Sequence, residues 1–436
     1  MSIRKPISSA TDQQQCHLLI LALASHVAGA CAGLVGALFR LSLDHADRFR
    51  DSVLSSSQSY GAGGLLLVVA ACAFATAIAA WLVERFSPEA SGSGIPHVEA
   101  VLLDERPPTR MKLVPVKFLG GLLAIGSGLA LGREGPTVQM GASISHLLGR
   151  KLGLSGVDNR SLLAAGAGAG LATAFNAPIA GAVFVLEELV RKFDTRMTIA
   201  TFGASTGAIT VARLLLGDRP DFDVEMLPFP TTFSVSASMV LGVVLGVLGV
   251  AYNRAILGAI SLSKKLQSWP VVMRAAAIGG SVGLLAWYAP QIVGGGDPIT
   301  QNALNLKTVA FMLPLAFLIR FGLGAISYAA ATPGGLFAPM LVLGAQAGLM
   351  FGNLCQTWVP AVTTNPTTYA VTAMAAFFTA VVRAPLTGII LVIELTGSYT
   401  QLLPMLAACF SAMLIPTLWK DPPIYDSLKP PVVNDE

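Results

Sequence analysis

Apolar runs interrupted by glycine and proline dominate the chain and limit the folds that are open to it. The runs at 18–39 and 61–82 are long enough to cross a bilayer, whereas many later runs are too short for a full crossing. Broken helices are tolerated at membrane depth only where protein or a cavity satisfies the freed backbone groups. We therefore predict an all-α polytopic membrane protein with many short, broken helices. The later runs are 95–103, 113–131, 138–148, 162–175, 179–186, 197–216, 235–252, 275–292, 309–319, 336–354, 369–382, 386–393 and 402–418.

The composition agrees with a membrane protein and argues against several other classes. Charged residues make up 12% of the chain, about half of the fraction that is usual in soluble domains, and the mean hydropathy is +0.68. The formal net charge of +4 predicts no nucleic-acid partner, because cationic loops normally follow from membrane orientation. The five cysteines and five histidines are scattered without metal or redox spacing, so we expect no metal, no cofactor and no disulfide framework.

Loop charges predict how the chain is oriented in the membrane. We expect residues 1–16 to be a cytoplasmic segment, 17–425 a transmembrane domain and 426–436 a short tail that no regulatory domain follows. The segment 44–60 reads as a polar loop. We place both termini in the cytoplasm and the protein in the cell (inner) membrane as a multi-pass protein. The expected cytoplasmic loops carry Arg106, Arg110, Lys112, Arg191, Lys192 and Arg196, and the expected external loop carries Asp218, Asp221, Asp223 and Glu225.

An internal repeat divides the chain. Residues 176–187 are echoed by 383–394, and in each segment a glutamate follows the proline by nine residues (187 − 178 and 394 − 385). Upstream, Pro136 and Pro339 each open a glycine-containing helix at a similar offset (339 − 136 = 203, against 385 − 178 = 207). Two related halves with interrupted helices in matching places are typical of a transporter whose site lies at the repeat interface. We place the two repeats at about 17–217 and 232–425.

The pentapeptide 132–136 introduces charge where the chain is otherwise almost uncharged. Arg133 and Glu134 lie between two apolar runs in which Lys117 is the only charge. Charge at membrane depth is costly and is usually kept for a function. The two glycines leave backbone amides uncovered, and Pro136 suits the first turn of a helix. A helix that begins here would direct its positive end at an anion beside Glu134; a tight turn with a local Arg–Glu pair is the alternative.

Three stretches share this design, because each places glycines before a proline that can open a helix. They lie at 92–96, 132–136 and 334–339. Each alone is a weak signal, but together in an apolar chain they predict three helix N-termini that converge on a dehydrated anion. Ser93 would add a hydroxyl donor, or could simply cap a helix. No Walker-type loop is present, so phosphate transfer does not fit.

In this order, the three motifs resemble those of the CLC family of chloride channels and chloride/proton exchangers, which is also called the voltage-gated chloride channel family. The resemblance runs from about residue 18 to residue 425. It implies a CLC-like fold of two inverted-topology repeats with tilted helices. It also implies a homodimer in the lipid bilayer, with one pathway per subunit for chloride and protons.

The resemblance implies roles for individual residues. Glu134 matches the external gating glutamate, whose carboxylate competes with chloride and carries protons, and Glu188 matches the internal proton-transfer glutamate of the exchangers. From the residues alone, Glu188 and Arg191 could instead be a solvated helical pair, and Tyr425 an interfacial tyrosine rather than an inner gate. The expected chloride-binding residues are Ser93, Gly94, Ile95, Arg133, Glu134, Gly135, Leu336, Phe337 and Tyr425.

Other charges of the apolar region are interpreted as structural. Glu187 and Glu394 are repeat mates, and Glu394 has no evident partner nearby in the sequence. Glu99 and Lys117 are expected to pair within the membrane region.

We predict a chloride/proton antiporter and not an enzyme. A passive chloride channel of the same family is the nearest alternative. A fluoride/proton antiporter is less favoured, because we would expect the position of Ser93 to be altered. An intramembrane enzyme would need a nucleophile–base pair or a metal set, which no motif supplies, and a receptor or scaffold would not need three anion motifs at helix ends.

Overall fold

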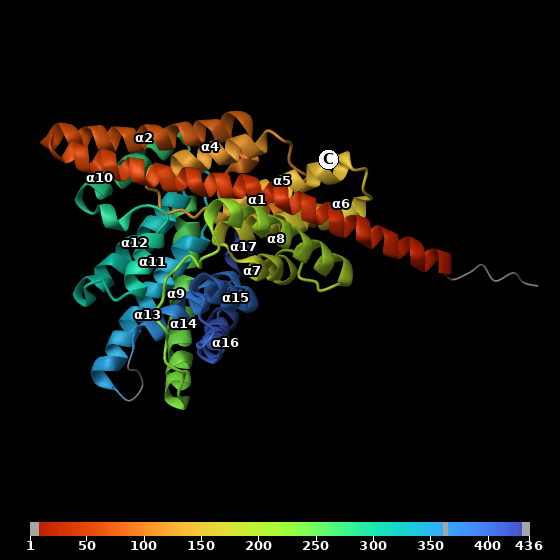
Figure 1. Cartoon of the computed structure of the whole chain (residues 1–436). Helices are drawn as coiled ribbons and strands as arrows, with labels where there is room; N and C mark the ends of the chain where they lie inside the picture. Colours follow the sequence, from red (N-terminus) through yellow and green to blue (C-terminus); the bar gives the residue numbers. More distant parts are fainter. Residues whose placement is uncertain (1–7, 361–364, 430–436) are drawn as a thin grey trace, which may run out of the picture.

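The computed structural model describes residues 8–360 and 365–429, and their regular structure is helical (Figure 1). The predicted N-terminal segment 1–16 and tail 426–436 therefore lie partly outside the described residues. Seven of the described helices are long and apolar enough to cross a membrane, and four others are apolar helices of 10–17 residues. The expected class, an all-α protein with many short helices, is confirmed.

The first half of the described chain contains eight α-helices before the non-helical segment 217–231, which we call the inter-repeat linker. A short 3₁₀ turn, Pro88–Ala90, precedes the third helix, and a π turn, Val185–Leu189, follows the seventh. The helices are α1 (Ser8–Gln58), α2 (Gly61–Phe86), α3 (Ile95–Leu102), α4 (Leu113–Gly126), α5 (Glu134–Lys151), α6 (Gly156–Phe175), α7 (Pro178–Phe184) and α8 (Thr195–Leu216).

The second half repeats this order and ends with one additional helix. A 3₁₀ turn, Pro290–Ile292, again precedes the third helix, and another, Ala310–Met312, precedes the fourth. The helices are α9 (Thr232–Lys265), α10 (Val271–Tyr288), α11 (Asp297–Leu304), α12 (Leu313–Tyr328), α13 (Phe337–Trp358), α14 (Thr367–Val382), α15 (Pro385–Thr396), α16 (Leu402–Leu418) and α17 (Ile424–Ser427).

Helices α7 and α15 run in opposite directions, as expected of inverted repeats. The Glu187 carboxylate, just after α7, accepts hydrogen bonds from two backbone N–H groups at the start of α15 (3.0 and 2.7 Å). The Glu394 carboxylate, near the end of α15, accepts from two backbone N–H groups at the start of α7 (3.0 and 2.7 Å). Each glutamate thus satisfies N–H groups that its neighbour helix leaves unpaired. The sequence did not reveal a partner for Glu394. Its partner in the structure is the start of α7, in the other half of the molecule.

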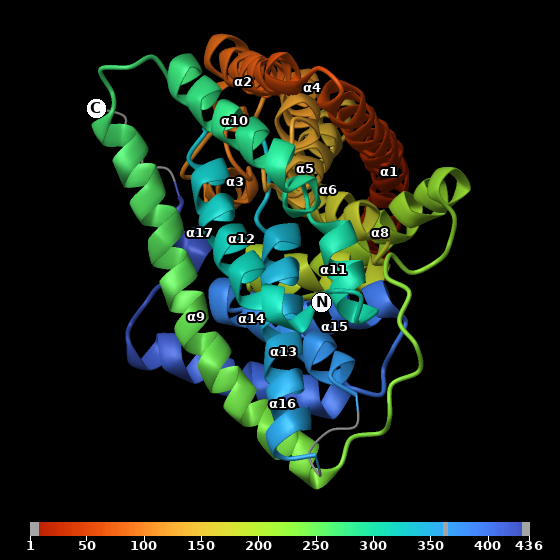
Figure 2. The ribbon, with the colours of Figure 1, turned by 90° about the vertical axis from the view of Figure 1, so that its left-hand side faces the viewer.

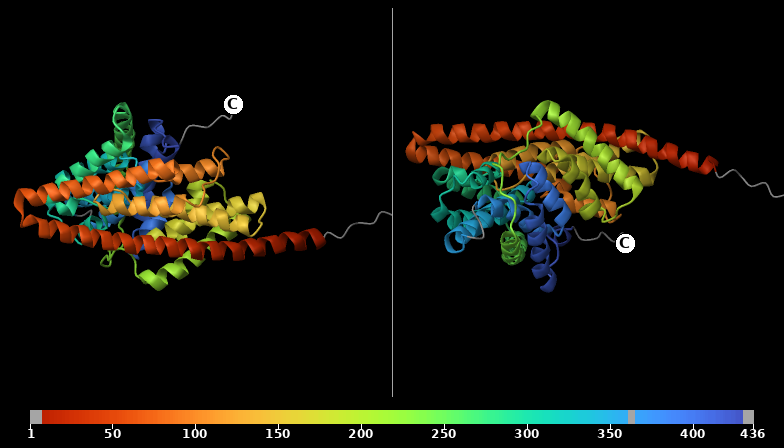
Figure 3. Two further views of the ribbon diagram at one scale, coloured as in Figure 1. Left: turned by 90° about the horizontal axis from the view of Figure 1, so that it is seen from above. Right: turned by 60° about the horizontal axis from the view of Figure 1, so that its bottom comes forward.

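The polar loop predicted at 44–60 is wrong, because α1 continues through it to Gln58. Within this stretch Arg50 pairs with Asp47 one helical turn earlier (2.6 Å), and Leu54 is buried. At 1.5 Å per residue, the 51 residues of α1 extend about 75 Å, far more than a bilayer core requires. In the left view of Figure 3, α1 and α2 diverge from their connecting turn, and α4 contacts both of them.

Small residues allow helices of the first half to approach closely. A side chain at Gly29 of α1 would overlap the backbone at Ala204 of α8, and one at Gly33 would overlap Ala208. Because both positions increase together along the chain, α1 and α8 are parallel. The Ala- and Gly-rich run 164–170 of α6 is fully buried in the same way and forms a packing surface.

The core of the second half is built around α14. Every residue of this helix is buried, as expected of a helix that is apolar all round. Figure 2 shows α14 in the middle of this half, with the long helix α9 along its edge.

Candidate anion site

The three glycine–proline loops meet at the centre of the molecule. Gly132 and Gly335 exchange two backbone hydrogen bonds (Gly132 N to Gly335 O, 2.9 Å; Gly335 N to Gly132 O, 2.7 Å). The loop before α3 joins them, because Gly92 accepts from Gly334 N (3.1 Å) and donates to the carbonyl of Thr332 (3.1 Å). The predicted convergence of the starts of α3, α5 and α13 is therefore present in the structure.

Local sequence explains why these helices begin here. Gly94, the N-cap of α3, has φ of +84°, a conformation that a residue with a side chain rarely adopts, and Pro96 follows in the first turn. Pro136 and Pro339 are each the third residue of their helix, where a backbone N–H has no helical partner. Glycine at 132 and 335 also leaves room for the carboxylate of Glu134, which a Cβ at either position would overlap.

The Glu134 carboxylate crosses from the first half to the second. Its Oε1 accepts a hydrogen bond from the backbone N–H of Phe337, the first residue of α13, at 2.5 Å. Its Oε2 makes no hydrogen bond to the part of the chain that the structure describes, although the residue is fully buried. The carboxylate thus lies at the positive end of a 22-residue helix, in the position that a small anion would take.

Ser93 and Tyr425 are two further residues of the expected site, and both are buried. Ser93 does not cap α3, whose N-cap is Gly94 and receives no side-chain bond. Instead, Ser93 is packed against Gly135, where an added Cβ would lie 2.7 Å from Ser93 Oγ. The Tyr425 hydroxyl lies near the Ser93 side chain, and neither hydroxyl makes a hydrogen bond to the described residues.

The phenyl ring of Phe337, whose backbone N–H binds Glu134, lies in an aromatic cluster. Its centroid lies 4.6 Å from that of Phe378, 5.6 Å from Phe184 and 6.1 Å from Tyr425. Tyr425 is fully buried in this aromatic cluster, so the alternative of an interfacial tyrosine is wrong. Leu336 is fully buried as the N-cap residue of α13.

Two cavities approach the site. A cavity of about 850 Å³ reaches Gly132, Arg133 and Ala338 beside the Glu134 carboxylate. A second cavity of about 420 Å³ reaches Ser93 and Gly94, and basic side chains, Lys264 and Arg274, line it. Glu134, Ser93 and Tyr425 are buried between the two, which makes this an occluded site with an approach from each cavity.

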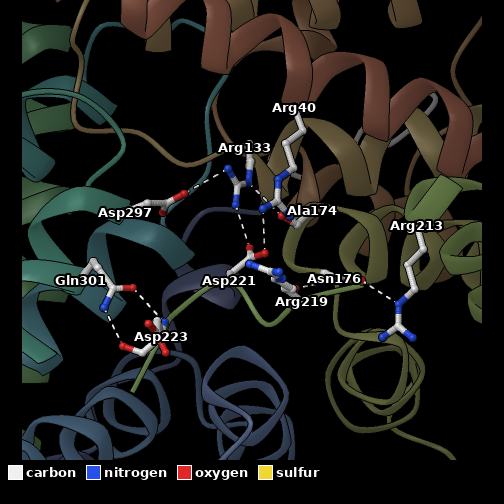
Figure 4. Close-up of polar contacts among 10 residues, drawn as sticks. All are labelled: Arg40, Arg133, Ala174, Asn176, Arg213, Arg219, Asp221, Asp223, Asp297 and Gln301. Carbon is white, nitrogen blue, oxygen red and sulfur yellow. Dashed lines mark hydrogen bonds and ion pairs between the residues drawn. The ribbon is translucent and has the colours of Figure 1, made fainter. Parts of the chain in front are cut away.

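The side chain of Arg133 is directed at Asp221 and Asp297 (Figure 4). Its guanidinium donates to the carbonyl of Ala174 (2.8 Å) and pairs with Asp221 and Asp297 (3.0 Å each). The alternative of a local Arg–Glu pair in the pentapeptide is therefore wrong. An anion at the site would meet the backbone at 133 rather than this guanidinium.

Glu188 lies in the π turn that follows α7. Val190 N donates to Val185 O (2.8 Å) across this turn, which turns the buried Glu188 carboxylate toward Arg191 (3.7 Å). Glu188 is 3% exposed, so the alternative of a solvated pair is wrong.

Arg191 belongs to a larger charge cluster. It also contacts Asp426 of α17 (3.0 Å) and Glu99 of α3 (3.4 Å), and Lys429 contacts both of these carboxylates (2.9 and 2.8 Å). We call Glu99, Glu188, Arg191, Asp426 and Lys429 the inner cluster.

The expected pair of Glu99 and Lys117 is wrong. The Lys117 ammonium donates to the carbonyls of Ala90 and Gly92 (3.0 and 2.8 Å), so it holds the loop before α3 instead of a carboxylate. Glu99 lies further along α3 and pairs with Lys429 in the inner cluster. Sequence spacing could not show this, because Lys117 is on α4 and reaches the loop only through tertiary packing.

A fourth glycine–proline loop, at 294–298, was missed from the sequence although it follows the same rule. It precedes α11, and its N-cap Gly296 has φ of +109°. The buried Arg320 donates to the carbonyls of Gly294 (2.8 Å) and Gly295 (3.2 Å) there. The polar sequence of α11 hides it from a search for apolar runs, but the glycines before Pro298 were a usable signal.

The fold and the site define a membrane transport protein built of two inverted halves around an occluded anion-type site. The chain belongs to the CLC family: the family model described as voltage gated chloride channel matches residues 75–417. The chain is 37% identical to the H(+)/Cl(-) exchange transporter ClcA of Vibrio cholerae serotype O1, over 96% of this chain and 90% of that protein. It is 36% identical to the transporter of the same name from Cronobacter sakazakii, over 94% and 89%.

Solved structures show the same architecture. A slow cyanobacterial Cl⁻/H⁺ antiporter superposes with a TM-score of 0.90 at 30% identity, covering 94% of this chain and 97% of that chain. A CLC-type fluoride/proton antiporter superposes with a TM-score of 0.79 at 21% identity, covering 94% and 97%, which is a likeness of fold alone. The expected CLC-like fold is confirmed.

Proposed function

We propose that this protein is a chloride/proton antiporter. The observation that carries the proposal is the Glu134 carboxylate on the Phe337 N–H, buried between two cavities. An ionised carboxylate in this position repels any anion that would take its place. The similarity to the exchange transporters of Vibrio cholerae and Cronobacter sakazakii supports the same reading.

The exchange follows from the charge of one side chain. Protonation of Glu134 removes its negative charge and weakens its charge-assisted hydrogen bond to Phe337. The side chain then leaves the amide, and chloride takes the helix end. Loss of the proton returns the carboxylate and expels the anion, so one site alternates between its own carboxylate and chloride.

The chloride ion would find donors from several elements. The buried hydroxyls of Ser93 and Tyr425 have free donor capacity beside the start of α5. A buried hydroxyl without a partner is costly, and an anion between the two would satisfy both. The backbones of Gly94, Ile95, Arg133, Gly135, Leu336 and Phe337 complete the proposed set.

Glu188 is the proposed inner proton acceptor. The inner cluster has three carboxylates, Glu99, Glu188 and Asp426, against two cations, Arg191 and Lys429, which leaves one surplus negative charge (3 − 2 = 1). A surplus carboxylate favours binding of one proton. Glu188 also has an oxygen without a hydrogen bond to the described residues, which could take that proton.

The proposed orientation places the inner cluster in the cytoplasm. The two basic loops meet at the start of α6, where Arg196 pairs with Asp158 (3.2 Å) and Arg160 pairs with Asp104. The inter-repeat linker lies at the end of the same helix, because Asn176 donates to the carbonyl of Arg219 (2.9 Å). The positive-inside rule then assigns the basic end to the cytoplasm and the linker to the outside.

Both ends of the chain follow this assignment. Helix α1 is parallel to α8, which begins beside Arg196, so α1 begins on the cytoplasmic side. Helix α17 contacts Arg191 on the same side. We further propose residence in the cell membrane and assembly as a homodimer, which the family resemblance supports and which cysteine cross-linking in membranes would test.

Proton uptake driven by a chloride gradient tests the proposed function. Purified protein in liposomes is given a chloride gradient, and external pH and chloride efflux are recorded together. We expect protons to move against chloride in a fixed ratio and to be driven uphill. Chloride efflux without proton movement would favour the passive channel, and preference for fluoride over chloride would favour the fluoride antiporter.

A further inference from the structure

The inter-repeat linker is attached to both halves of the molecule (Figure 4). Its Arg219 carbonyl accepts from Asn176 at the end of α6, and Arg213 donates to the same asparagine (3.1 Å). On the other half, Phe222 N donates to the carbonyl of Leu395 of α15 (2.9 Å), and the backbone of Asp223 exchanges two hydrogen bonds with a glutamine side chain of α11 (2.9 and 2.7 Å). The linker backbone is therefore fixed on both sides of residue 221.

This attachment directs the Asp221 carboxylate at two arginines. One oxygen pairs with Arg40 of α1 (2.7 Å) and the other with Arg133 (3.0 Å). The Asp221 side chain is 7% exposed, and those of Arg40 and Arg133 are 17% and 11% exposed. Ion pairs so little exposed are screened far less than surface pairs, and loss of one partner leaves the other charges uncompensated.

Arg133 directly precedes Glu134 and is held at all three nitrogens. Nε donates to the carbonyl of Ala174, Nη2 pairs with Asp221 and Nη1 pairs with Asp297. Two carboxylates thus balance the two arginines, Arg40 and Arg133. The field of Arg133 at Glu134 is reduced by this balance, and the backbone that carries Glu134 is anchored to the linker.

We propose that Asp221 is a positioning residue for the external gate, which it sets through Arg133. By neutralising Arg133 and fixing its side chain, Asp221 lets Glu134 leave the Phe337 amide when it is protonated. Without Asp221, Asp297 is the one carboxylate left to balance Arg40 and Arg133, and the surplus positive charge stabilises ionised Glu134 on that amide and keeps the gate closed for longer. This inference rests on the proposed function, because it assigns a role in gating to a residue outside the site.

The substitution Asp221→Asn tests the inference, with Asp223→Asn as a matched control. Asp223 lies two residues further along the same linker and is exposed, and it meets Gln301 through its backbone only, so its substitution changes the net charge equally without touching the arginines. We expect chloride efflux from liposomes to fall about fivefold with Asp221→Asn and to be unchanged with Asp223→Asn.

The same substitution in the Glu134→Ala background separates gating from a purely structural role. With no carboxylate at 134, Arg133 has no gate to hold, so we expect Asp221→Asn to leave chloride efflux unchanged there. Equal slowing in both backgrounds, or unchanged or faster efflux in the wild-type background, would overturn the proposal. Proton uptake by the wild-type protein, recorded in the same liposomes, tests the proposed function separately, because the inference is measured on chloride alone.

A second variant keeps the test decisive if Asp221→Asn does not fold. Asp297→Asn removes the other carboxylate of Arg133 at a side chain that is 43% exposed, and it leaves the buried pairs intact. We expect slowing in the same direction, of about twofold, again only when Glu134 is present. Slowing that persists in the Glu134→Ala background would contradict the proposal.

Discussion

The two halves of the molecule hold their loops with the same kinds of hydrogen bond. Lys117 donates to the carbonyls of the glycine loop before α3, and Arg320 does the same before α11, at the repeat offset (320 − 117 = 203). Glu187 and Glu394 each cap the short helix of the other half (394 − 187 = 207). Gly132 and Gly335, also mates (335 − 132 = 203), bond to each other across the repeat interface.

The halves differ at the positions assigned to transport. Glu134 has Phe337 as its mate (337 − 134 = 203), and one supplies the carboxylate that binds the other's amide. Ser93 has Gly295 as its mate, by the offset of Pro96 and Pro298 (298 − 96 = 202), and Glu188 has Leu395 (395 − 188 = 207). Positions alike in both halves hold the scaffold, whereas positions that differ place a hydroxyl or a carboxylate in one half only. Transport chemistry therefore depends on where the symmetry is broken.

The largest effect is expected at Glu134, which accepts a hydrogen bond from its repeat mate Phe337. Glu134→Ala removes the carboxylate and leaves the starts of α5 and α13 free for anions. We expect chloride efflux to persist, to lose its dependence on pH and to move no protons. Glu134→Gln, which keeps the shape, should also move no protons. Chloride-driven proton uptake by either variant would show that Glu134 is not the gate.

The pair at 187 and 188 tests the comparison at the inner side. Glu188 has no carboxylate counterpart in the second half. Glu188→Gln keeps the size of this side chain but removes its titration, so we expect proton transport to be lost while chloride still moves. Glu187→Gln changes a cap that both halves possess. We expect it to keep coupling and to lower the free energy of unfolding by about 1 kcal/mol, like Glu394→Gln. Coupling lost with Glu187→Gln and kept with Glu188→Gln would reverse the assignment within the pair.

The sequence predicted the scaffold better than the contacts within it. Apolar runs and glycine–proline loops marked most helices, because membrane burial and helix starts leave local signals. Helix α11 and the end of α1 were missed, since their residues are polar and their helicity depends on neighbours. The glycine loops and Glu134 were found from the sequence, but the partners of Lys117, Arg133 and Glu394 were not. Those partners are more than 20 residues away along the chain and are brought near only by the fold.

The smallest expected effect concerns Ser93, a serine that the second half lacks at the matching position. The prediction tests whether this serine sets the anion preference. Ser93→Pro removes the hydroxyl and also the backbone N–H, which donates to the Tyr328 hydroxyl (3.2 Å). Ser93→Ala removes the hydroxyl alone and serves as the matched variant. Loss of a donor to the anion weakens the binding of a small, strongly hydrated ion such as chloride more than that of nitrate. We expect reversal potentials in mixed salts to shift toward nitrate by about threefold or more in relative permeability for both variants. A shift with Ser93→Pro alone would assign the preference to the backbone, and no shift with either would leave Ser93 as a packing residue against Gly135.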